Sequence, residues 1–281
     1  MEVWFTEKQT ENLSLSCQVS EVLVNKVTSF QEIGIFETPS FGRMLVLDGY
    51  IQTTEMDEYL YHEMIAHVPM NTHPDPRYVL VIGGGDGGTV REVLKHPSVE
   101  KVTMVEIDRE VVEACREYLP VTSQALGNPN VKVEFEDGFQ FLNRHPGQFD
   151  IVIVDSTEPV GPAAELFGRE FYELAYKALA PGGILVAQTE SPFYNRDLIV
   201  SSHKYLKEFF PVVEMYLAPV PSYPGGLWSF TLASRQNQPT AEEVLQKAKQ
   251  PDKCKYYSPE VHRGAFILPP FVQEIISQKE E

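Results

Sequence analysis

The sequence predicts an α/β protein in which a small antiparallel β domain precedes a parallel, doubly wound sheet. Apolar strand-like segments alternate with helix-like segments from residue 78 onward, and a glycine-rich turn over 83–88 follows the first of these strands. Before residue 57, strand-like stretches follow one another and no segment has helical periodicity. We therefore divide the 281 residues into an N-terminal β domain, 1–56, and a larger α/β domain, 57–281.

Three N-terminal segments are rich in branched and aromatic residues, namely 13–24, 30–38 and 44–47. A turn signal separates the second from the third, and Asp48-Gly49 after the third is a pair typical of hairpins. These features predict antiparallel strands.

The larger domain begins with a predicted helix and continues as alternating strands and helices. Asp108 is expected to cap a helix, and Pro181-Gly182-Gly183 is expected to end one. The final two strands resemble a hairpin, which predicts an antiparallel edge, and a short helix, a loop and a terminal helix are expected after residue 241. The predicted helices are 59–68, 87–95, 109–118 and 171–180, and the predicted strands are 78–82, 101–107, 131–135, 149–154, 184–188, 212–217 and 228–233.

Composition excludes several classes of protein. A formal net charge of −17 makes nucleic acid a poor partner, although an acidic surface can attract cations or merely keep the chain dissolved. No apolar run is long enough to span a membrane, and residues 1–5 lack the features of a signal peptide, so we expect a cytoplasmic protein with no membrane partner. The three cysteines are far apart in sequence, which predicts reduced thiols and no metal site.

The turn after the first parallel strand has the pattern G-x-G-x-x-G, with Gly83, Gly85 and Gly88. Such glycines let a ligand approach the backbone, and Glu106, about 20 residues further on, is placed to accept hydrogen bonds from ribose hydroxyls. Asp86 within the turn would repel a pyrophosphate and attract an amine. It is equally suited to capping the following helix.

Two further strand ends carry acids. Asp155 and Glu158 stand three positions apart after the strand 149–154, at the sheet edge where ligands of open α/β sheets bind, and the pair suits a ligand with amines. Asp137-Gly138 ends the third strand, where the carboxylate can accept the exocyclic amine of adenine or simply form a turn. Together these segments predict an enzyme that joins a nucleoside co-substrate to a cationic amine.

A zinc helix is not expected. His62 and His67 are five residues apart, whereas the zinc motif H-E-x-x-H places its histidines four apart on one face. Five residues put the two side chains roughly 140° apart around a helix. His67 is expected to be packed or to cap, and Tyr61 and His62 stay candidates for ligand contact.

The motifs together resemble those of the polyamine aminopropyltransferase family over nearly the whole chain. The resemblance rests on the GGGDGG turn, the V-E-I-D strand end, a D-S-[ST]-[DE]-P-x-G-P-A loop, a Q-x-E segment and P-[ST]-Y-P-x-G-x-W. In this sequence the motifs occupy 83–88, 105–108, 155–163, 188–190 and 221–228. The N-terminal half adds Phe30-Gln31, Leu47-Asp48-Gly49, Gln52, Asp57-Glu58 and Tyr61-His62-Glu63.

This resemblance implies a Rossmann-like, methyltransferase-type sheet behind the N-terminal β domain. It implies transfer of the aminopropyl group of decarboxylated S-adenosylmethionine to putrescine, which yields spermidine and methylthioadenosine. Decarboxylated S-adenosylmethionine is then a co-substrate, and no permanently bound cofactor is expected. The resemblance also implies a homodimer or homotetramer.

Site residues follow from the matching positions. The resemblance implies that Asp155 takes a proton from the attacking amine, helped by Tyr61. It assigns Glu106 to the ribose; Asp137, Gly138, Pro162 and Ala163 to the adenine; Gln31, Gln52, His62 and Asp86 to the aminopropyl side; Glu158, Gln188, Tyr223 and Trp228 to the diamine channel; and Trp4 to its entrance.

Two departures from the family pattern leave alternatives open. Many members have Asp where Glu158 stands, so agmatine or another amine is an alternative acceptor. At the second departure, His62 replaces a glutamine of some relatives, and little change is expected from it.

An S-adenosylmethionine-dependent amine methyltransferase would share the fold, but Asp86 would repel the carboxylate of its donor. A non-catalytic polyamine or nucleoside binding protein is the remaining alternative, and the joint presence of Tyr61, Asp155 and Gln188 argues against it.

Overall fold

A computed structural model describes residues 2–157 and 165–277. Glu158, Pro162 and Ala163, which the sequence assigned to the site, lie outside the described residues. In the described part of the chain, no helix combines the length and apolar character needed to cross a membrane.

The centre of the molecule is a seven-stranded sheet with the order β12-β13-β11-β10-β7-β8-β9. The strands from β11 to β9 in this order run parallel, and β13 runs antiparallel to both β11 and β12. The predicted parallel sheet with an antiparallel edge is therefore confirmed. The strands are β7 (Tyr78–Gly83), β8 (Lys101–Glu106), β9 (Val131–Phe135), β10 (Phe149–Asp155), β11 (Leu179–Gln188), β12 (Val212–Pro219) and β13 (Leu227–Ser234).

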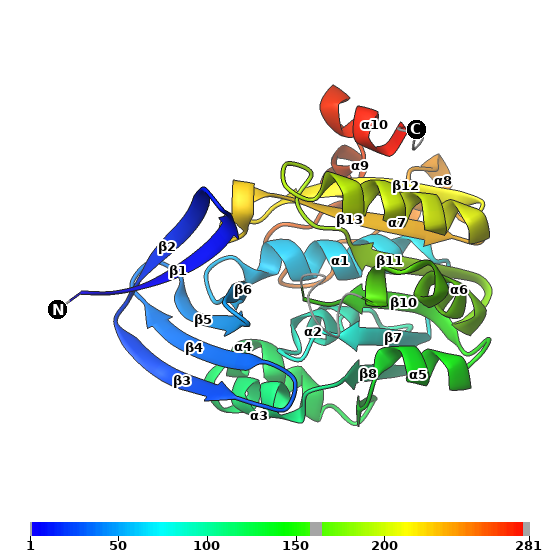
Figure 1. The fold of residues 1–281 in the computed structure, drawn as a ribbon. Helices are drawn as coiled ribbons and strands as arrows, with labels where there is room; N and C mark the ends of the chain where they lie inside the picture. Colours follow the sequence, from blue (N-terminus) through cyan, green and yellow to red (C-terminus); the bar gives the residue numbers. More distant parts are fainter. Residues whose placement is uncertain (1, 158–164, 278–281) are drawn as a thin grey trace.

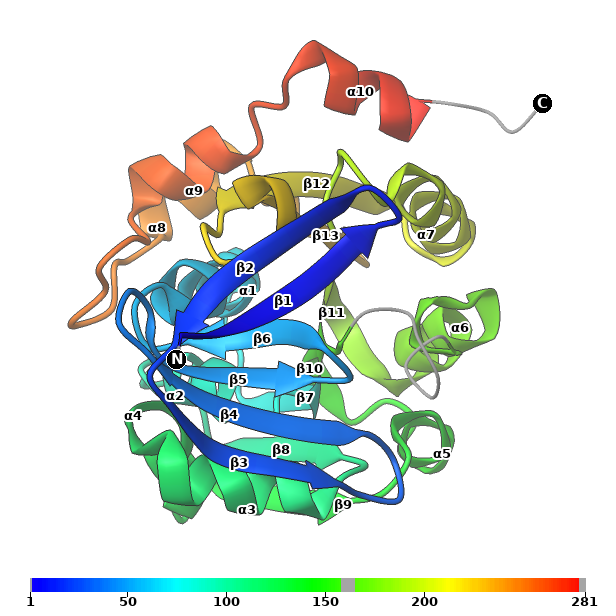
Figure 2. The ribbon, with the colours of Figure 1, turned by 60° about the vertical axis from the view of Figure 1, so that its left-hand side comes forward.

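Helices cover both faces of this sheet, as Figures 1 and 2 show. The side chains of β7 point alternately to the two faces and are apolar on both. Val79 and Val81 belong to the hydrophobic cluster that includes α1 and α2, whereas Leu80 and Ile82 belong to the cluster that includes α5, α6 and α7. The apolar run predicted to be buried on both faces is buried on both faces. The helices are α1 (Glu58–Thr72), α2 (Gly88–Val93), α3 (Arg109–Tyr118), α4 (Pro120–Ser123), α5 (Gly138–Arg144), α6 (Arg169–Ala178), α7 (Arg196–Phe209), α8 (Glu242–Lys247), α9 (Pro259–Ala265) and α10 (Pro270–Ser277).

The N-terminal strands form a hairpin and a four-stranded antiparallel sheet at one end of the central sheet (Figure 1). The four-stranded sheet packs on α3, where Ile33 and Leu45 meet Val111 and Cys115. This contact places the small sheet over the carboxyl ends of the parallel strands. The strands are β1 (Val3–Thr10), β2 (Leu13–Val19), β3 (Glu21–Val27), β4 (Glu32–Thr38), β5 (Gly42–Leu47) and β6 (Tyr50–Thr54).

Several predicted boundaries need correction. The segment 13–24 is two strands rather than one, and α1 continues through Pro69 to Thr72 because its apolar residues stay buried. Helix α6 ends at Ala178, before the Pro-Gly-Gly segment, because Leu179 already pairs with Phe149 of β10. Helices α4, α5 and α7 were not predicted, and the C-terminal segment holds three helices instead of two.

Candidate active site

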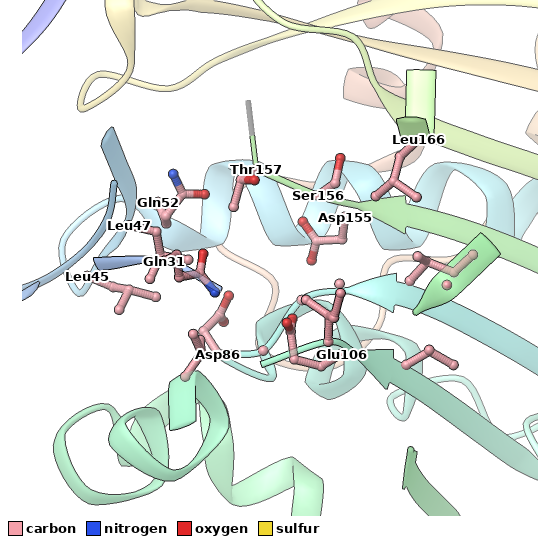
Figure 3. Close-up of a pocket in the computed structure, with 18 of the residues that line it drawn as sticks. Gln31, Leu45, Leu47, Gln52, Asp86, Glu106, Asp155, Ser156, Thr157 and Leu166 are labelled. Atoms are coloured by element: carbon pink, nitrogen blue, oxygen red, sulfur yellow. The ribbon is translucent and has the colours of Figure 1, made fainter. Parts of the chain in front are cut away.

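A pocket lies between the carboxyl ends of the parallel strands and the N-terminal sheet. In Figure 3, Asp155 and Glu106 project from two strand ends, with Gln31 and Gln52 on the side of the N-terminal sheet. The predicted site residues that line this pocket are Gln31, Gln52, Tyr61, His62, Asp86, Glu106, Asp137, Gly138, Asp155 and Tyr223.

The glycine turn lies directly against the end of β10. Gly84 N donates to the backbone oxygen of Asp155 at 2.8 Å. Gly83 has φ +82°, and a Cβ there would lie 2.1 Å from that same oxygen. Only glycine fits this conformation and this contact. The turn thus fixes where the Asp155 backbone leaves the sheet.

Asp155 accepts two side-chain hydrogen bonds at the bottom of the pocket. Tyr61 Oη donates to Oδ1 at 2.8 Å, and Thr89 Oγ1 donates to Oδ2 at 2.6 Å. Burial raises the pKa of Asp155, and the neighbouring Asp86 adds to the rise, although His62 and the two hydroxyls oppose it. A carboxylate with a raised pKa inside a pocket is suited to accepting a proton.

His62 is held between two carboxylates. Its Nδ1 lies 2.6 Å from Glu58 Oε2, one turn earlier on α1, and its Nε2 lies 3.5 Å from Asp86 Oδ1. Burial disfavours the charged ring, but Asp86 and Glu58 outweigh it and raise the pKa of His62 well above its usual value. Arg91 completes the group by donating both terminal nitrogens to Glu58, at 3.0 and 2.8 Å.

The Asp86 side chain contacts the backbone at the start of α2 and also lines the pocket, whereas its contact with an amine stays a prediction. Its Oδ1 accepts from Gly88 N at 2.7 Å, at the start of α2, and the residue also lines the pocket beside His62. Gly88 cannot carry a side chain, because a Cβ would lie 2.2 Å from Cε1 of His62. The turn, the helix start and the imidazole are therefore packed as one unit.

Glu106 is buried at the end of β8. Its Oε1 accepts from Asp108 N at 2.9 Å, and Asp108 in turn caps α3 and accepts from Gln31 Nε2 at 3.1 Å. Burial raises the pKa of Glu106 to about 7, although backbone N–H groups oppose the rise. The absence of a side chain at Gly85 leaves room for the carboxyl, since a Cβ there would lie 3.1 Å from Glu106 Oε2.

Asp137 and Gly138 lie at the end of β9, on the rim of the same pocket. Asp137 Oδ1 accepts from Gln140 N at 2.8 Å and caps α5, so the pair begins a helix and does not form the turn that was the alternative to an adenine contact. A Cβ on Gly138 would lie 2.6 Å from Cγ2 of Ile82. The adenine contact stays a prediction.

A second, small pocket adjoins the first and shares residues with it, including Gln52, Tyr61 and Tyr223. Gln188, Glu190 and Trp228 form its other walls. Gln188 Nε2 donates to Glu190 Oε1 at 3.0 Å, and the buried Trp228 Nε1 has no hydrogen-bond partner among the described residues. Trp4 lies on β1, more than half exposed, and lines neither pocket in the single chain.

Sequence reasoning missed several groups that hold the site together. Thr89, Glu58 and Arg91 were given no role, although Glu58 directly precedes the predicted helix 59–68 and its i, i+4 spacing to His62 was a usable signal. Glu190 belongs to the quoted Q-x-E motif but was given no role. It has φ +66°, an uncommon conformation for a residue other than glycine, asparagine or aspartate.

The chemical character of the two pockets is acidic. Asp86, Glu106, Asp155 and Glu190 line them, and among the described lining residues there is no lysine or arginine. The arrangement can bind a cationic ligand, accept hydrogen bonds from hydroxyls and take up a proton.

Comparison with known proteins identifies the family. Residues 58–243 match the spermine/spermidine synthase domain, and residues 3–55 match the spermidine synthase tetramerisation domain. A polyamine aminopropyltransferase of Thermoanaerobacter sp. (strain X514) is 51% identical over 278 residues, which cover 99% of this chain and 100% of that relative. One from Moorella thermoacetica is 50% identical over 279 residues, covering 99% of this chain and 98% of that relative.

Solved structures agree with the sequence relatives. A spermidine synthase in complex with the transition state analogue AdoDATO has a TM-score of 0.93 and 41% identity, covering 98% of this chain and 94% of the other. The spermidine synthase of Thermotoga maritima has a TM-score of 0.92, again with 41% identity and coverage of 98% and 94%. The predicted Rossmann-like fold is therefore confirmed, and the chain belongs to the spermine/spermidine synthase family of polyamine aminopropyltransferases.

Proposed function

We propose that the enzyme transfers the aminopropyl group of decarboxylated S-adenosylmethionine to putrescine and releases spermidine and methylthioadenosine. The observation that carries the proposal is the position of Asp155. Its carboxylate stands in the pocket between the strand ends and the N-terminal sheet, which is the larger of the two adjoining pockets. It hydrogen-bonds to Tyr61, which also lines the small pocket. A nucleoside donor in the large pocket and a diamine in the small one would meet at this carboxylate.

The proposed step is a displacement at carbon. The amine nitrogen of putrescine attacks the aminopropyl carbon bound to the sulfonium, the carbon–sulfur bond breaks, and its electron pair stays on sulfur to give the neutral thioether. One amine proton passes to Asp155. Because the sulfonium is already a good leaving group, the protein has to align the three atoms and remove the proton.

The roles of the remaining residues are part of the proposal. Glu106 binds the ribose hydroxyls, whose hydrogen bonds favour its ionised form. Asp137 and Gly138 face the adenine. Gln31, Gln52, His62 and Asp86 surround the donor's aminopropyl chain, where the acid of the pair His62–Asp86 meets the terminal ammonium. Gln188, Tyr223 and Trp228 enclose the diamine, and the assignments of Glu158, Pro162 and Ala163 lie outside the described residues.

The acidic lining supports the decarboxylated donor over S-adenosylmethionine itself. Intact S-adenosylmethionine carries a carboxylate, which needs a cationic partner when it is buried. Among the described lining residues the side chain that could supply a positive charge is His62, whose pKa is raised, but Glu58 and Asp86 already hold it. Burying that carboxylate beside Asp86 without a cationic partner is unfavourable. We further propose that the enzyme works in the cytoplasm as a homodimer or homotetramer.

The direct test offers the pure protein putrescine together with either donor and identifies the products by mass spectrometry. Spermidine and methylthioadenosine, formed from the decarboxylated donor alone, are the expected products. Methylated putrescine from S-adenosylmethionine would overturn the proposal. Turnover of agmatine or a longer amine in preference to putrescine would keep the reaction type and correct the acceptor.

A further inference from the structure

A cluster of three metal-ligand residues lies outside both pockets. His67 is on α1, Glu92 is on α2, and Cys254 lies in the segment between α8 and α9. The histidine and the glutamate are fully buried, and the cysteine is partly buried. The 140° between His62 and His67 thus gives the two histidines of α1 different surroundings: one faces the active site and the other faces this cluster.

The ligand atoms are close enough to share one ion. His67 Nε2 lies 2.9 Å from Glu92 Oε2 and 3.2 Å from Cys254 Sγ, and all three atoms lie within 4.8 Å of one another. Ligands of a tetrahedral zinc ion, at about 2.0–2.3 Å from the metal, are roughly 3.3–3.7 Å apart. We propose that His67 Nε2, Glu92 Oε2 and Cys254 Sγ form a binding site for a zinc-like divalent cation, with the fourth position open to water.

The surroundings of the cluster fix two of the ligands. His96 Nε2 lies 3.0 Å from His67 Nδ1, so a proton on Nδ1 can be shared with His96 while Nε2 is left as the ligand atom. Glu63 accepts the backbone N–H groups of Lys255, Tyr256 and Tyr257 at 2.7–2.8 Å, and these residues directly follow Cys254. A nitrogen, an oxygen and a sulfur ligand in one site favour zinc over magnesium or calcium.

Two positively charged side chains already contact Glu92, and one of them would compete with a metal ion for the same carboxylate oxygen. Arg91 Nε donates to Oε1 at 2.8 Å, whereas Lys95 Nζ lies on Oε2, the oxygen assigned to the metal. The Lys95 side chain is 22% exposed, so it can turn towards solvent when an ion takes its place. Coordination of Cys254 forms the metal–sulfur bond and releases the thiol proton to solvent. The bound ion would link α1, α2 and the C-terminal segment.

The test uses the reduced, tag-free, full-length protein after treatment with a chelator. Cobalt(II) is added and the near-ultraviolet absorption of a cobalt–thiolate bond is recorded, and zinc affinity is measured by calorimetry. Wild type is expected to show the band, Cys254→Ser to lose it with an affinity at least about tenfold weaker, and the matched control Cys17→Ser to keep it. Lys95→Gln, which retains every ligand, is expected to bind zinc more tightly.

Three results would overturn the site. The first is the absence of a thiolate band in the wild type, and the second is a band of equal strength in Cys254→Ser. The third is a zinc affinity of Lys95→Gln equal to or weaker than that of the wild type. Circular dichroism of the metal-free variants guards against misfolding, and Lys95→Gln keeps the proposal testable even if Cys254→Ser does not fold. Neither measurement depends on the proposed reaction.

Discussion

Replacing Asp155 with asparagine separates its chemical role from its structural one. Tyr61 and Thr89 donate to the two carboxylate oxygens, and both hydroxyls can also accept, so an amide can replace the carboxylate with one reversed hydrogen bond. What is lost is the proposed proton acceptor. We expect kcat to fall by about 10²–10⁴-fold, as for other general bases, which corresponds to roughly 3–5 kcal/mol in the barrier.

The same substitution is expected to leave the protein at least as stable. Because burial raises the pKa of Asp155, its contribution to stability is full below the pKa of the unfolded chain and is lost as pH rises through the folded value. At neutral pH the neutral amide removes this penalty. Release of methylthioadenosine at saturating substrates measures kcat, and urea unfolding measures stability.

A matched control lies at the other end of the same strand. Asp150 accepts the backbone N–H groups of Arg77 and Tyr78 through one oxygen, which an asparagine can retain. Asp150→Asn is therefore expected to keep its activity. A kcat for Asp155→Asn within threefold of wild type, or an equal loss in Asp150→Asn, would refute the assignment of Asp155 as the proton acceptor.

Three further outcomes follow from the site. Gly88→Ala is expected to lose stability, by about 1–3 kcal/mol, together with activity, whereas Gly127→Ala, whose Cβ meets nothing within 4 Å, changes neither in urea unfolding and turnover assays. Because burial raises the pKa of Glu106 to about 7, wild-type stability is expected to fall as pH rises from 5 to 8. Urea unfolding at a series of pH values measures this fall, and an equal loss of stability in Glu106→Gln would contradict the assignment. Tyr61→Phe removes a hydrogen bond that lowers the pKa of Asp155, so the acid limb of its kcat/KM profile is expected to move to higher pH; an unmoved limb is the contrary result.

Local signals in the sequence were sufficient for much of the fold. The apolar run of β7 predicted a strand buried on both faces, and Asp108 before an amphipathic segment predicted the start of α3. The end of α6 could not be predicted in this way. Pro-Gly-Gly is a strong stop signal, but the pairing of Leu179 with Phe149 ends the helix at Ala178, two residues before the predicted end, and that pairing depends on a distant strand.

The residues of the candidate site also differ in whether local sequence or distant packing determines their place. Residues at strand ends, such as Glu106 and Asp155, were predictable because parallel strands place their carboxyl ends at one edge. Thr89 was not, since its bond to Asp155 joins residues 66 positions apart. The link from Arg91 to Glu58 and on to His62 likewise exists only once α1 and α2 pack together.

The backbone contact between the glycine turn and the end of β10 has a consequence for how new specificities can arise. Gly84 N bonds to the main chain of Asp155, so peptide groups fix the backbone of the proposed proton acceptor, while Tyr61 of the small pocket contacts its carboxylate. Other walls of the small pocket come from a different segment, with Trp228 on β13 and Tyr223 in the loop before it. With the amine in the small pocket, as proposed, its preference can be redesigned, or drift during evolution, by substitutions in the β12–β13 region while the backbone of Asp155 stays in place.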